Sequence, residues 1–371
     1  MNPPGTTLPR PEKPPTRWTI ATALAYPAAL VLLLVVLRWV GERWWLTTVG
    51  LFVPWILLAL PLPLFCLLLW RRGPRRLLVT QGVAALLLLF PLGGFVLPWP
   101  ARPDPRAPII RVLSYNVMHG YGGPDRIVAE IDRFAPDIVL LQKLYANIEP
   151  VGDLLNARYP HVEWSAGAMV ASRFPILSRI DPDDPLPDDE SAVVAFIQRV
   201  IATPLGPIAF YDCHPTSARE GLMAAARLQR EAAKIVRAET ALRVGQVRRL
   251  SARARQETIP VVIAGDTNLT DLSPLLRAEL SRYRDGFREA GWGFGYTYPF
   301  NLFPWMRLDR ILAGDSLRFV RFQIGSSDAS DHLCVVAAPV RIPALSPGAL
   351  AALLASLLVV AAAALPRRRR S

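Results

Sequence analysis

The chain has 371 residues, of which 52% are hydrophobic, and its mean hydropathy is positive, at +0.27. This composition argues against a wholly soluble protein. The net charge of +12 is uneven: residues 1–104 and 347–371 hold 14 Lys/Arg and 3 Asp/Glu, a balance of +11, whereas residues 105–346 hold 28 and 27, a balance of +1. The basic charge therefore lies at the ends of the chain, and the near-neutral middle argues against a nucleic-acid partner.

Four uncharged runs predict membrane-spanning helices. Each run has about 20 residues or more, the length a helix needs to cross a hydrocarbon core about 30 Å thick. Tryptophans stand at their edges, as is typical of the headgroup region. A cleaved signal peptide would be shorter than the first run and would end in small residues. The runs are Trp18–Leu37, Leu46–Trp70, Leu77–Pro100 and Leu345–Leu365.

Basic clusters flank these runs and predict their orientation. One cluster precedes the first run, one lies between the second and third, and Arg367–Arg370 follows the last. The positive-inside rule puts all three in the cytoplasm, so the large segment between the third and fourth runs faces the exoplasmic side of the cell membrane. The last run also fits a hydrophobic sorting tail that a processing enzyme removes. We expect a cytoplasmic N-terminus (1–17), three transmembrane helices (18–100), a proline-rich linker (101–108), an exoplasmic domain (109–344), a C-terminal transmembrane helix (345–366) and a basic cytoplasmic tail (367–371).

Strand-like and helix-like patterns alternate in the segment 109–344. The apolar runs are rich in β-branched residues and carry polar side chains at one end, so strands packed side by side would gather those ends along one rim. Helical spacing predicts a helix in "DRIVAEIDRF" and a long one over about 219–252, with Leu228, Ala232, Ile235 and Leu242 on one stripe. The strand-like runs are "RVLSYNV", "DIVLLQK", "IAFYDCH", "PVVIAGDTN" and "SDHLCVVAAPV".

The polar residues along these runs follow a recognisable order. Asn116, "LLQ", His214, "GDTN", "RLDRI" and "SDH" succeed one another in the chain. This order resembles the endonuclease/exonuclease/phosphatase superfamily over about residues 109–342, with "GDTN" and "SDH" as the most specific parts. The resemblance implies an α+β, DNase I-like fold, a two-layer β-sandwich flanked by helices. It also implies divalent-metal-dependent hydrolysis of a phosphate ester at the top of the sandwich.

Hydrolysis of a phosphate ester needs a base near the attacking water, donors to the phosphoryl oxygens and usually a hard cation held by carboxylates. By resemblance, Asp266 orients or deprotonates water and Asn268 contacts the phosphate. His332 binds the phosphoryl group while Asp309 holds its ring and favours the charged form. The resemblance further implies His214 as a second phosphate donor, Asn116 and Asp331 as ligands or orienters of Mg²⁺ or Mn²⁺, and Arg173 and Thr297 as substrate-binding residues.

Lys143 departs from the family pattern. In the superfamily a glutamate follows "LLQ" and is the main metal ligand, whereas this chain has an ammonium group there. Two unit charges about 4 Å apart interact by about 4 kcal/mol at an effective dielectric constant near 20, so the lysine and a cation compete for the same carboxylates. Three interpretations stay open: the ammonium replaces the metal, the metal shifts to Asn116, Asp331 and Asp266, or the domain binds phosphate without cleaving it.

Three functional hypotheses follow. The arrangement of three spans before an exoplasmic domain resembles membrane-anchored teicoplanin-resistance type proteins, which implies a bacterial cell envelope and a lipid-linked phosphate or pyrophosphate. The first hypothesis is therefore a membrane-bound phosphoesterase that acts on a lipid-linked or headgroup phosphate. The second is an exoplasmic nuclease, against which the balance of +1 over 105–346 counts. The third is a phosphate-binding module without catalysis. The sequence leaves the natural substrate and the oligomeric state open.

Overall fold

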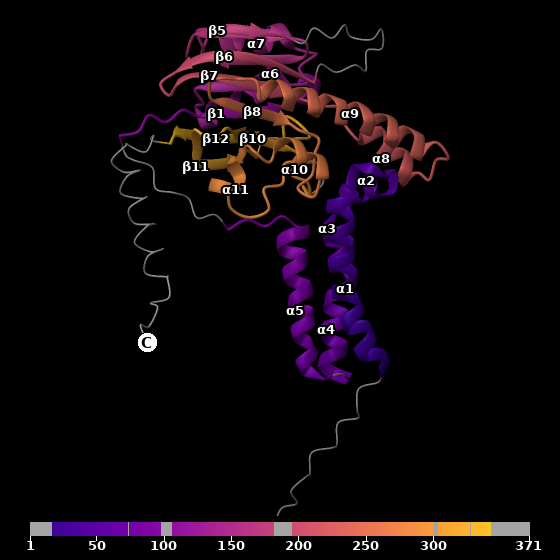
Figure 1. Ribbon diagram of the computed structural model, residues 1–371. Helices are drawn as coiled ribbons and strands as arrows, with labels where there is room; N and C mark the ends of the chain where they lie inside the picture. The colour runs from indigo at the N-terminus through magenta and orange to yellow at the C-terminus, as the bar shows by residue number, and fades with distance from the viewer. Residues whose placement is uncertain are drawn as a thin grey trace, which may run out of the picture.

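The computed structural model describes residues 17–72, 74–97, 106–181, 195–299, 303–326 and 328–342. These residues form a bundle of apolar helices and a larger domain of strands and helices at one end of the bundle (Figure 1). The predicted cytoplasmic N-terminus, most of the predicted linker and the whole predicted C-terminal span lie outside the described residues, and they stay predictions.

The helical bundle holds two candidate membrane spans, and a bent pair of helices is a third candidate. Ile20–Trp39 and Arg75–Leu92 are long and apolar enough to cross a membrane. The second predicted run is broken, because Trp45–Leu51 and Trp55–Arg71 meet at 86°, and only if this bent pair counts as one span does the number reach three. Pro54 lies at the break with an extended backbone, and proline lacks the N–H that a continuous helix requires.

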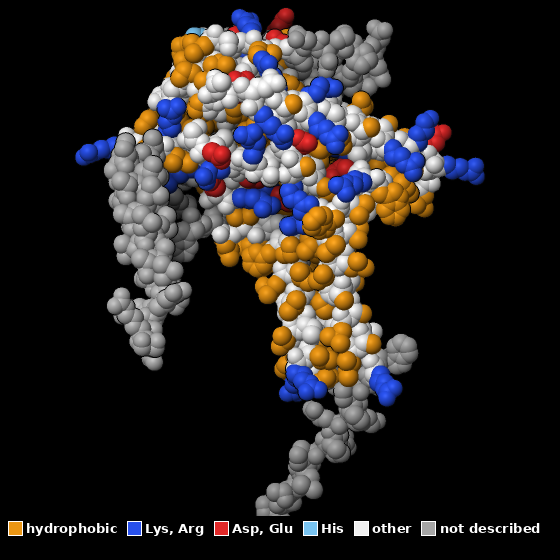
Figure 2. Space-filling model, viewed as in Figure 1, with side chains coloured by type: hydrophobic (Ala, Val, Ile, Leu, Met, Phe, Trp, Pro, Cys, Tyr) orange, Lys and Arg blue, Asp and Glu red, His pale blue; other side chains and the backbone are white. Residues whose placement is uncertain are grey.

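The bundle exposes an apolar surface. Helices α1, α4 and α5 lie side by side and contact one another (Figure 1), and hydrophobic side chains cover their outer surface (Figure 2). Leu32, Leu60 and Val79 are each more than 60% exposed, and an apolar surface of this extent fits contact with lipid. The elements are α1 (Arg17–Trp39), η1 (Gly41–Arg43), α2 (Trp45–Leu51), α3 (Trp55–Ala59), α4 (Pro61–Arg72), η2 (Arg75–Leu77), α5 (Leu78–Leu87) and η3 (Leu88–Leu92).

The domain is built on two six-stranded sheets with the orders β11-β12-β1-β2-β4-β3 and β5-β6-β7-β8-β10-β9. Parallel pairs β1–β2 and β7–β8 lie inside the two sheets, among antiparallel neighbours. The strands are β1 (Val112–Asn116), β2 (Ile138–Gln142), β3 (His161–Ser165), β4 (Ala168–Ser172), β5 (Ile176–Ile180), β6 (Phe196–Thr203), β7 (Gly206–Cys213), β8 (Val261–Asp266), β9 (Arg284–Asp285), β10 (Asp309–Ala313), β11 (Leu317–Ile324) and β12 (Val335–Arg341).

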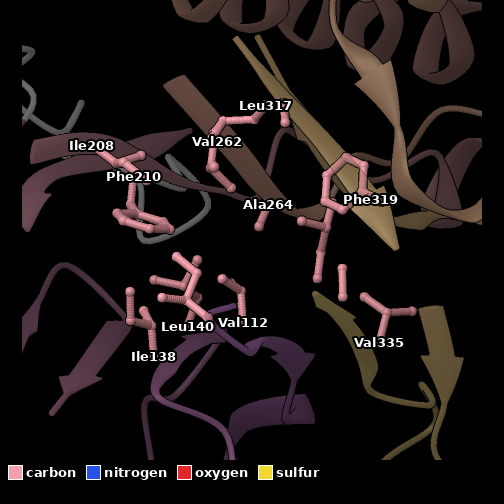
Figure 3. Close-up of a cluster of buried hydrophobic side chains, with 14 of the residues drawn as sticks. Val112, Ile138, Leu140, Ile208, Phe210, Val262, Ala264, Leu317, Phe319 and Val335 are labelled. Atoms are coloured by element: carbon pink, nitrogen blue, oxygen red, sulfur yellow. The ribbon is translucent and has the colours of Figure 1, made fainter. Parts of the chain in front are cut away.

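Apolar side chains fill the space between the two sheets. Val112 and Leu140 of the first sheet pack with Phe210 and Val262 of the second (Figure 3). Helices α6 (Pro124–Phe134) and α7 (Ile148–Asn156) cover the outer face of the first sheet, and α9 (Ala232–Ala254) and α10 (Pro274–Leu280) cover that of the second. The predicted α+β sandwich flanked by helices is therefore confirmed. The remaining elements are η4 (Met118–Gly120), α8 (Arg219–Ala226) and α11 (Gly286–Ala290).

The long helix predicted over 219–252 is two helices, and this prediction was wrong. Helices α8 and α9 are separated at Leu228, whose backbone has a positive φ of 54°, a conformation that costs energy in a helix of L-residues. Leu228 is 91% exposed and Leu242 is 59% exposed. The buried face of α9 contains the predicted Ala232 together with Val236, Val247 and Leu250, because this face covers the second sheet.

Candidate active site

Pairing between strands brings the predicted polar residues to one rim of the sandwich. Asp266, the last residue of β8, lies opposite Asp309, the first residue of β10. Asn116 at the end of β1 lies opposite Gln142 at the end of β2. Gly265 makes the turn into the site possible: its φ is 143°, and a Cβ atom there would lie 1.9 Å from the carbonyl oxygen of Cys213, so only glycine fits.

The Asp266 carboxylate is the centre of the site, and it is buried. Its Oδ1 accepts the backbone N–H of Asn268 at 2.9 Å, and its Oδ2 accepts the side-chain amide of Asn116 at 3.0 Å. The ring Nε2 atoms of His214 and His332 each lie 3.6 Å from Oδ2. Burial raises the pKa of Asp266, but the two histidines and these donors outweigh it, so the net pKa is lowered and the carboxylate is ionised at neutral pH.

His332 is held from both sides. Its Nδ1 lies 2.9 Å from Oδ2 of Asp309, and the ring of Tyr298 lies 4.5 Å from its own ring, centroid to centroid. Burial opposes a charge on this imidazole, yet Asp309 and Asp266 raise the pKa of His332 to about 9. His332 therefore carries a proton at pH 7 and offers Nε2–H as a charged donor.

His214 differs from His332 although both face Asp266. Burial lowers the pKa of His214 to about 4, with a contribution from the Lys143 ammonium and against the attraction of Asp266. Its Nδ1 is buried and has no hydrogen-bond partner among the described residues. The ring is therefore neutral at pH 7. We call Asp266, Asp309, His214 and His332 the Asp–His group.

Lys143 lies beside the Asp–His group. It follows β2, has a positive φ of 58° and lines a small recess together with Tyr145 and His214. Within the described part of the chain, its ammonium has no hydrogen bond or ion pair, so its charge remains available to an anion. Asp331 lies at the same rim, where its carboxylate is 3.7 Å from the Arg219 guanidinium. Asn116, Lys143 and Asp331 are called the "lysine side" of the site.

The lysine side does not supply the donors of a magnesium site. Mg²⁺ requires near-octahedral oxygen ligands, but Asn116 turns its amide nitrogen to Asp266, and its oxygen accepts the backbone N–H of Met118 at 3.1 Å. Asp266, Asp309 and His332 have ligand atoms within 4.8 Å of one another. However, Nδ1 of His332 is bound to Asp309, and its protonated ring has no free lone pair. The predicted Mg²⁺ or Mn²⁺ stays a prediction, and the residues present do not complete its site.

Two predicted residues have partners that limit direct contact with substrate. The side-chain amide of Asn268 donates to the carbonyl of Pro215 at 2.9 Å. Thr297 is fully buried, and its hydroxyl oxygen accepts the backbone N–H groups of Leu308 and Asp309 at 3.3 Å. Thr297 therefore supports Asp309 rather than facing a ligand.

Arg173 lies away from the rim. Residue 172, which precedes it, pairs with Ile138 at the start of β2, whereas Lys143 follows the other end of that strand. The guanidinium of Arg173 is 3.7 Å from the Asp137 carboxylate and 5.5 Å from the centre of the Tyr159 ring. The structure therefore does not bring Arg173 to the site, because an ion pair fixes it at the opposite end of the sheet.

Sequence reasoning missed three residues at the rim. Arg219 faces Asp331, Tyr298 covers His332, and His119 stacks on Tyr121 with ring centroids 5.2 Å apart while its backbone N–H donates to the carbonyl of Lys143. None of them belongs to a strand end. Only the position of Arg219 shortly after His214 hinted at a role, because the chain returns to the rim there.

A comparison with protein families decides the class. A model described as the Endonuclease/Exonuclease/phosphatase family matches residues 113–332, more than half of the chain. The chain belongs to the endonuclease/exonuclease/phosphatase family. The predicted superfamily is confirmed, and so is the class of enzyme, a hydrolase of phosphate ester bonds. The resemblance to teicoplanin-resistance type proteins stays a prediction, since a comparison with curated protein sequences finds no match.

Solved structures of the same family are similar to the chain. An endonuclease/exonuclease/phosphatase from Beutenbergia cavernae is 20% identical, with 64% of this chain and 72% of that chain covered and a TM-score of 0.44. A family member from Bacteroides thetaiotaomicron is 16% identical, with coverage of 64% and 100% and a TM-score of 0.48. Sphingomyelinase C from Streptomyces griseocarneus is 19% identical, with coverage of 62% and 99% and a TM-score of 0.44. Similarity at this level carries no argument about the substrate.

Proposed function

We propose that this chain is a membrane-anchored phosphoesterase that acts at the exoplasmic face on a lipid-linked or headgroup phosphate. In this proposal Lys143 supplies the positive charge that a divalent cation supplies in other family members. The observation that carries it is the position of Lys143, beside a buried Asp–His group and without a carboxylate partner among the described residues. An ammonium group there attracts a phosphate dianion rather than a cation.

Each group in the site has a task in this reaction. The charged Nε2–H of His332 and the Lys143 ammonium bind phosphoryl oxygens and stabilise the negative charge that grows on them in the transition state. Asp266 is ionised and accepts a hydrogen bond from the attacking water. Asp309 keeps the proton on His332, and Thr297 keeps Asp309 in place through its strand.

The membrane part of the proposal is supported by the apolar bundle. The start of α1 and the connection between α4 and α5 lie at the end of the bundle away from the domain (Figure 1). Arg71 and Arg75 belong to that connection, so the positive-inside rule favours a cytoplasmic location for this end. The domain then lies at the exoplasmic face.

A topology assay checks the orientation. We expect a cysteine introduced by Arg321→Cys, on exposed β11, to react with a membrane-impermeant maleimide in intact cells. A cysteine introduced by Arg75→Cys should react only after the membrane is permeabilised. The opposite pattern would place the domain in the cytoplasm and would refute exoplasmic action.

The activity is tested on the full chain in lipid nanodiscs. The panel contains a polyprenyl phosphate, a polyprenyl pyrophosphate, phosphatidic acid, p-nitrophenyl phosphate and plasmid DNA, each with EDTA or with Mg²⁺. We expect phosphate release from at least one lipid substrate in EDTA, and none from an Asp266→Asn variant. Cleavage of plasmid alone would replace the proposal with a nuclease.

Lys143 also favours a second candidate, a phosphate-binding module without catalysis. In that case wild-type protein binds inorganic phosphate but releases none from any substrate in the panel. A Lys143→Glu variant would then gain Mg²⁺-dependent hydrolysis, because it restores the carboxylate that the family uses. An active wild type that Asp266→Asn inactivates would exclude this candidate.

A further inference from the structure

A cavity with charged side chains in its wall lies where the bundle meets the domain, apart from the Asp–His group. Its volume is about 250 Å³, and three arginines line it: Arg38 from the end of α1, Arg277 from α10 and Arg288 from α11. The carboxylates of Asp271 and Asp285 also line it. One arginine therefore comes from the apolar bundle and two come from the domain.

The two carboxylates do not neutralise these three arginines. Arg310, which is fully buried, lies 3.2 Å from both Asp271 and Asp285, and the buried Arg307 lies 2.8 Å from Asp285. Buried arginines beside buried carboxylates form compensated pairs. The negative charges of Asp271 and Asp285 are thus balanced by Arg307 and Arg310. The positive charges of the three arginines that line the cavity are not balanced by these two carboxylates.

The lining arginines have few other partners. Arg277 donates to the backbone carbonyl of Arg38 at 2.8 Å and lies 5.1 Å from the centre of the Trp39 ring, while Arg288 reaches Asp271 only at 3.5 Å. Over the described ranges, neither Arg38 nor Arg277 makes an ion pair with a carboxylate. Their donors can therefore take an anion without breaking an existing pair.

An apolar cavity adjoins this basic one. Its volume is about 200 Å³, and Leu33, Leu37 and Leu58 of the bundle line it. Asp271 and Leu272 line both cavities, and the consecutive residues Leu37 and Arg38 each line one of them. Figure 2 shows Lys and Arg side chains gathered directly above the apolar surface of the bundle. The combination presents an anion site on top of a hydrocarbon site.

We propose that this pair of cavities binds one anionic phospholipid, with its phosphate among Arg38, Arg277 and Arg288 and the start of an acyl chain in the apolar cavity. Guanidinium groups match phosphate oxygens in bidentate geometry, and basic side chains near a membrane surface attract anionic headgroups. Trp39, which is 63% exposed at the end of α1, lies where tryptophans meet the headgroup layer. The inference needs the bundle to lie in a membrane, as proposed above, but it does not need the site to be catalytic.

The bound lipid would fix the domain against the membrane. It would join α1 to α10 and α11, next to the hydrogen bond between Ser273 and Glu42. The loop from Asp266 to Ser273 connects this junction to the catalytic rim. A lipid in this place would hold the rim at a constant height above the headgroups.

Native mass spectrometry of the full chain in mild detergent tests the proposal. The probes are phosphatidylglycerol, phosphatidylcholine, glycerol 3-phosphate and inorganic phosphate. We expect phosphatidylglycerol to be retained at least about tenfold more than phosphatidylcholine, and Arg277→Gln/Arg288→Gln to lose about tenfold of that retention. The matched control Arg237→Gln/Arg321→Gln removes two exposed arginines elsewhere and should retain the lipid like wild type.

Each other outcome overturns the proposal. Equal retention of the two lipids, or equal loss in the control variant, would leave only non-specific attraction. Displacement of phosphatidylglycerol by millimolar glycerol 3-phosphate would show a site for a soluble anion. If the double glutamine variant is destabilised, Arg277→Lys/Arg288→Lys keeps both charges and should still lose part of the retention, because lysine lacks the bidentate fork. No step of this test measures hydrolysis, and extraction with alkaline carbonate reports separately whether the chain is inserted in the membrane.

Discussion

The two sides of the proposed catalytic rim would offer positive charge to a phosphate by different means. In the Asp–His group, two carboxylates keep a proton on His332, and the charged donor is made by hydrogen bonding. On the lysine side the positive group is the Lys143 ammonium, which has no carboxylate partner among the described residues. The comparison teaches that, in the proposed reaction, a phosphate would meet two kinds of donor, one charged through its carboxylate partners and one without a carboxylate partner among the described residues.

Removing the carboxylate at the centre should have the largest effect. Asp266→Asn keeps the shape but loses the negative charge that orients water and balances two histidines. We expect phosphate release to fall by about 10²–10⁴-fold, measured by initial rates in nanodiscs. Asp125→Asn, an exposed position at the start of α6, is the matched control and should be neutral. A loss of less than tenfold in Asp266→Asn would remove this residue from the reaction.

Replacing the Lys143 ammonium comes next. Lys143→Met should lower the rate by about 10²–10³-fold, the range for loss of one preorganised donor to a developing charge. The control is Lys234→Met on exposed α9, which the account predicts to be silent. If Lys143→Met is as active as wild type in EDTA, the reaction does not need the charge of Lys143, and the proposed role of this residue is wrong.

The pH dependence sharpens the comparison, because it reports on His332 of the Asp–His group. The folded-state pKa of His332 is raised to about 9, above an ordinary value of about 6.5. The stabilisation is therefore complete below pH 6.5 and is lost as pH rises through 9, with a magnitude on the order of 3 kcal/mol. Unfolding temperatures between pH 6.5 and 10 should fall in wild type but fall less in His332→Asn. A His161→Asn control should behave as wild type.

Support behind the Asp–His group should matter least. Thr297→Val removes the oxygen that accepts two backbone N–H groups, and leaving buried donors unpaired costs about 1–3 kcal/mol. We expect a lower unfolding temperature and a rate reduced by about tenfold, with an unchanged KM. A change confined to KM would instead place Thr297 in contact with substrate.

The sequence predicted the sandwich and the Asp–His group because both depend on strand ends. Asp266 is the last residue of β8 and Asp309 is the first residue of β10, and the two strands pair there. The order of the motifs was therefore enough to predict that the two carboxylates lie close together. Arg173 follows a strand too, but at its far end. The direction of a strand within the sheet decides which of its ends reaches the rim. The local sequence pattern does not predict that direction.

Other features depend on tertiary contacts that hydropathy cannot report. The second predicted span is bent by 86°, although its composition matches that of a straight helix. The arginine cavity joins Arg38 to Arg277 and Arg288, residues far apart in the chain and without a shared motif. Tyr298 belongs to none of the predicted strand ends, and only its distance from His332 shows that it covers that ring.

The most direct test of the central claim is the affinity for inorganic phosphate with EDTA in place of Mg²⁺, measured by isothermal titration calorimetry on the full chain. If Lys143 replaces the cation, the wild-type dissociation constant changes by no more than about twofold between the two conditions. Lys143→Met then weakens binding by about tenfold or more, which is about 1.4 kcal/mol. Binding that requires Mg²⁺ in the wild type and is undiminished in Lys143→Met would contradict the account.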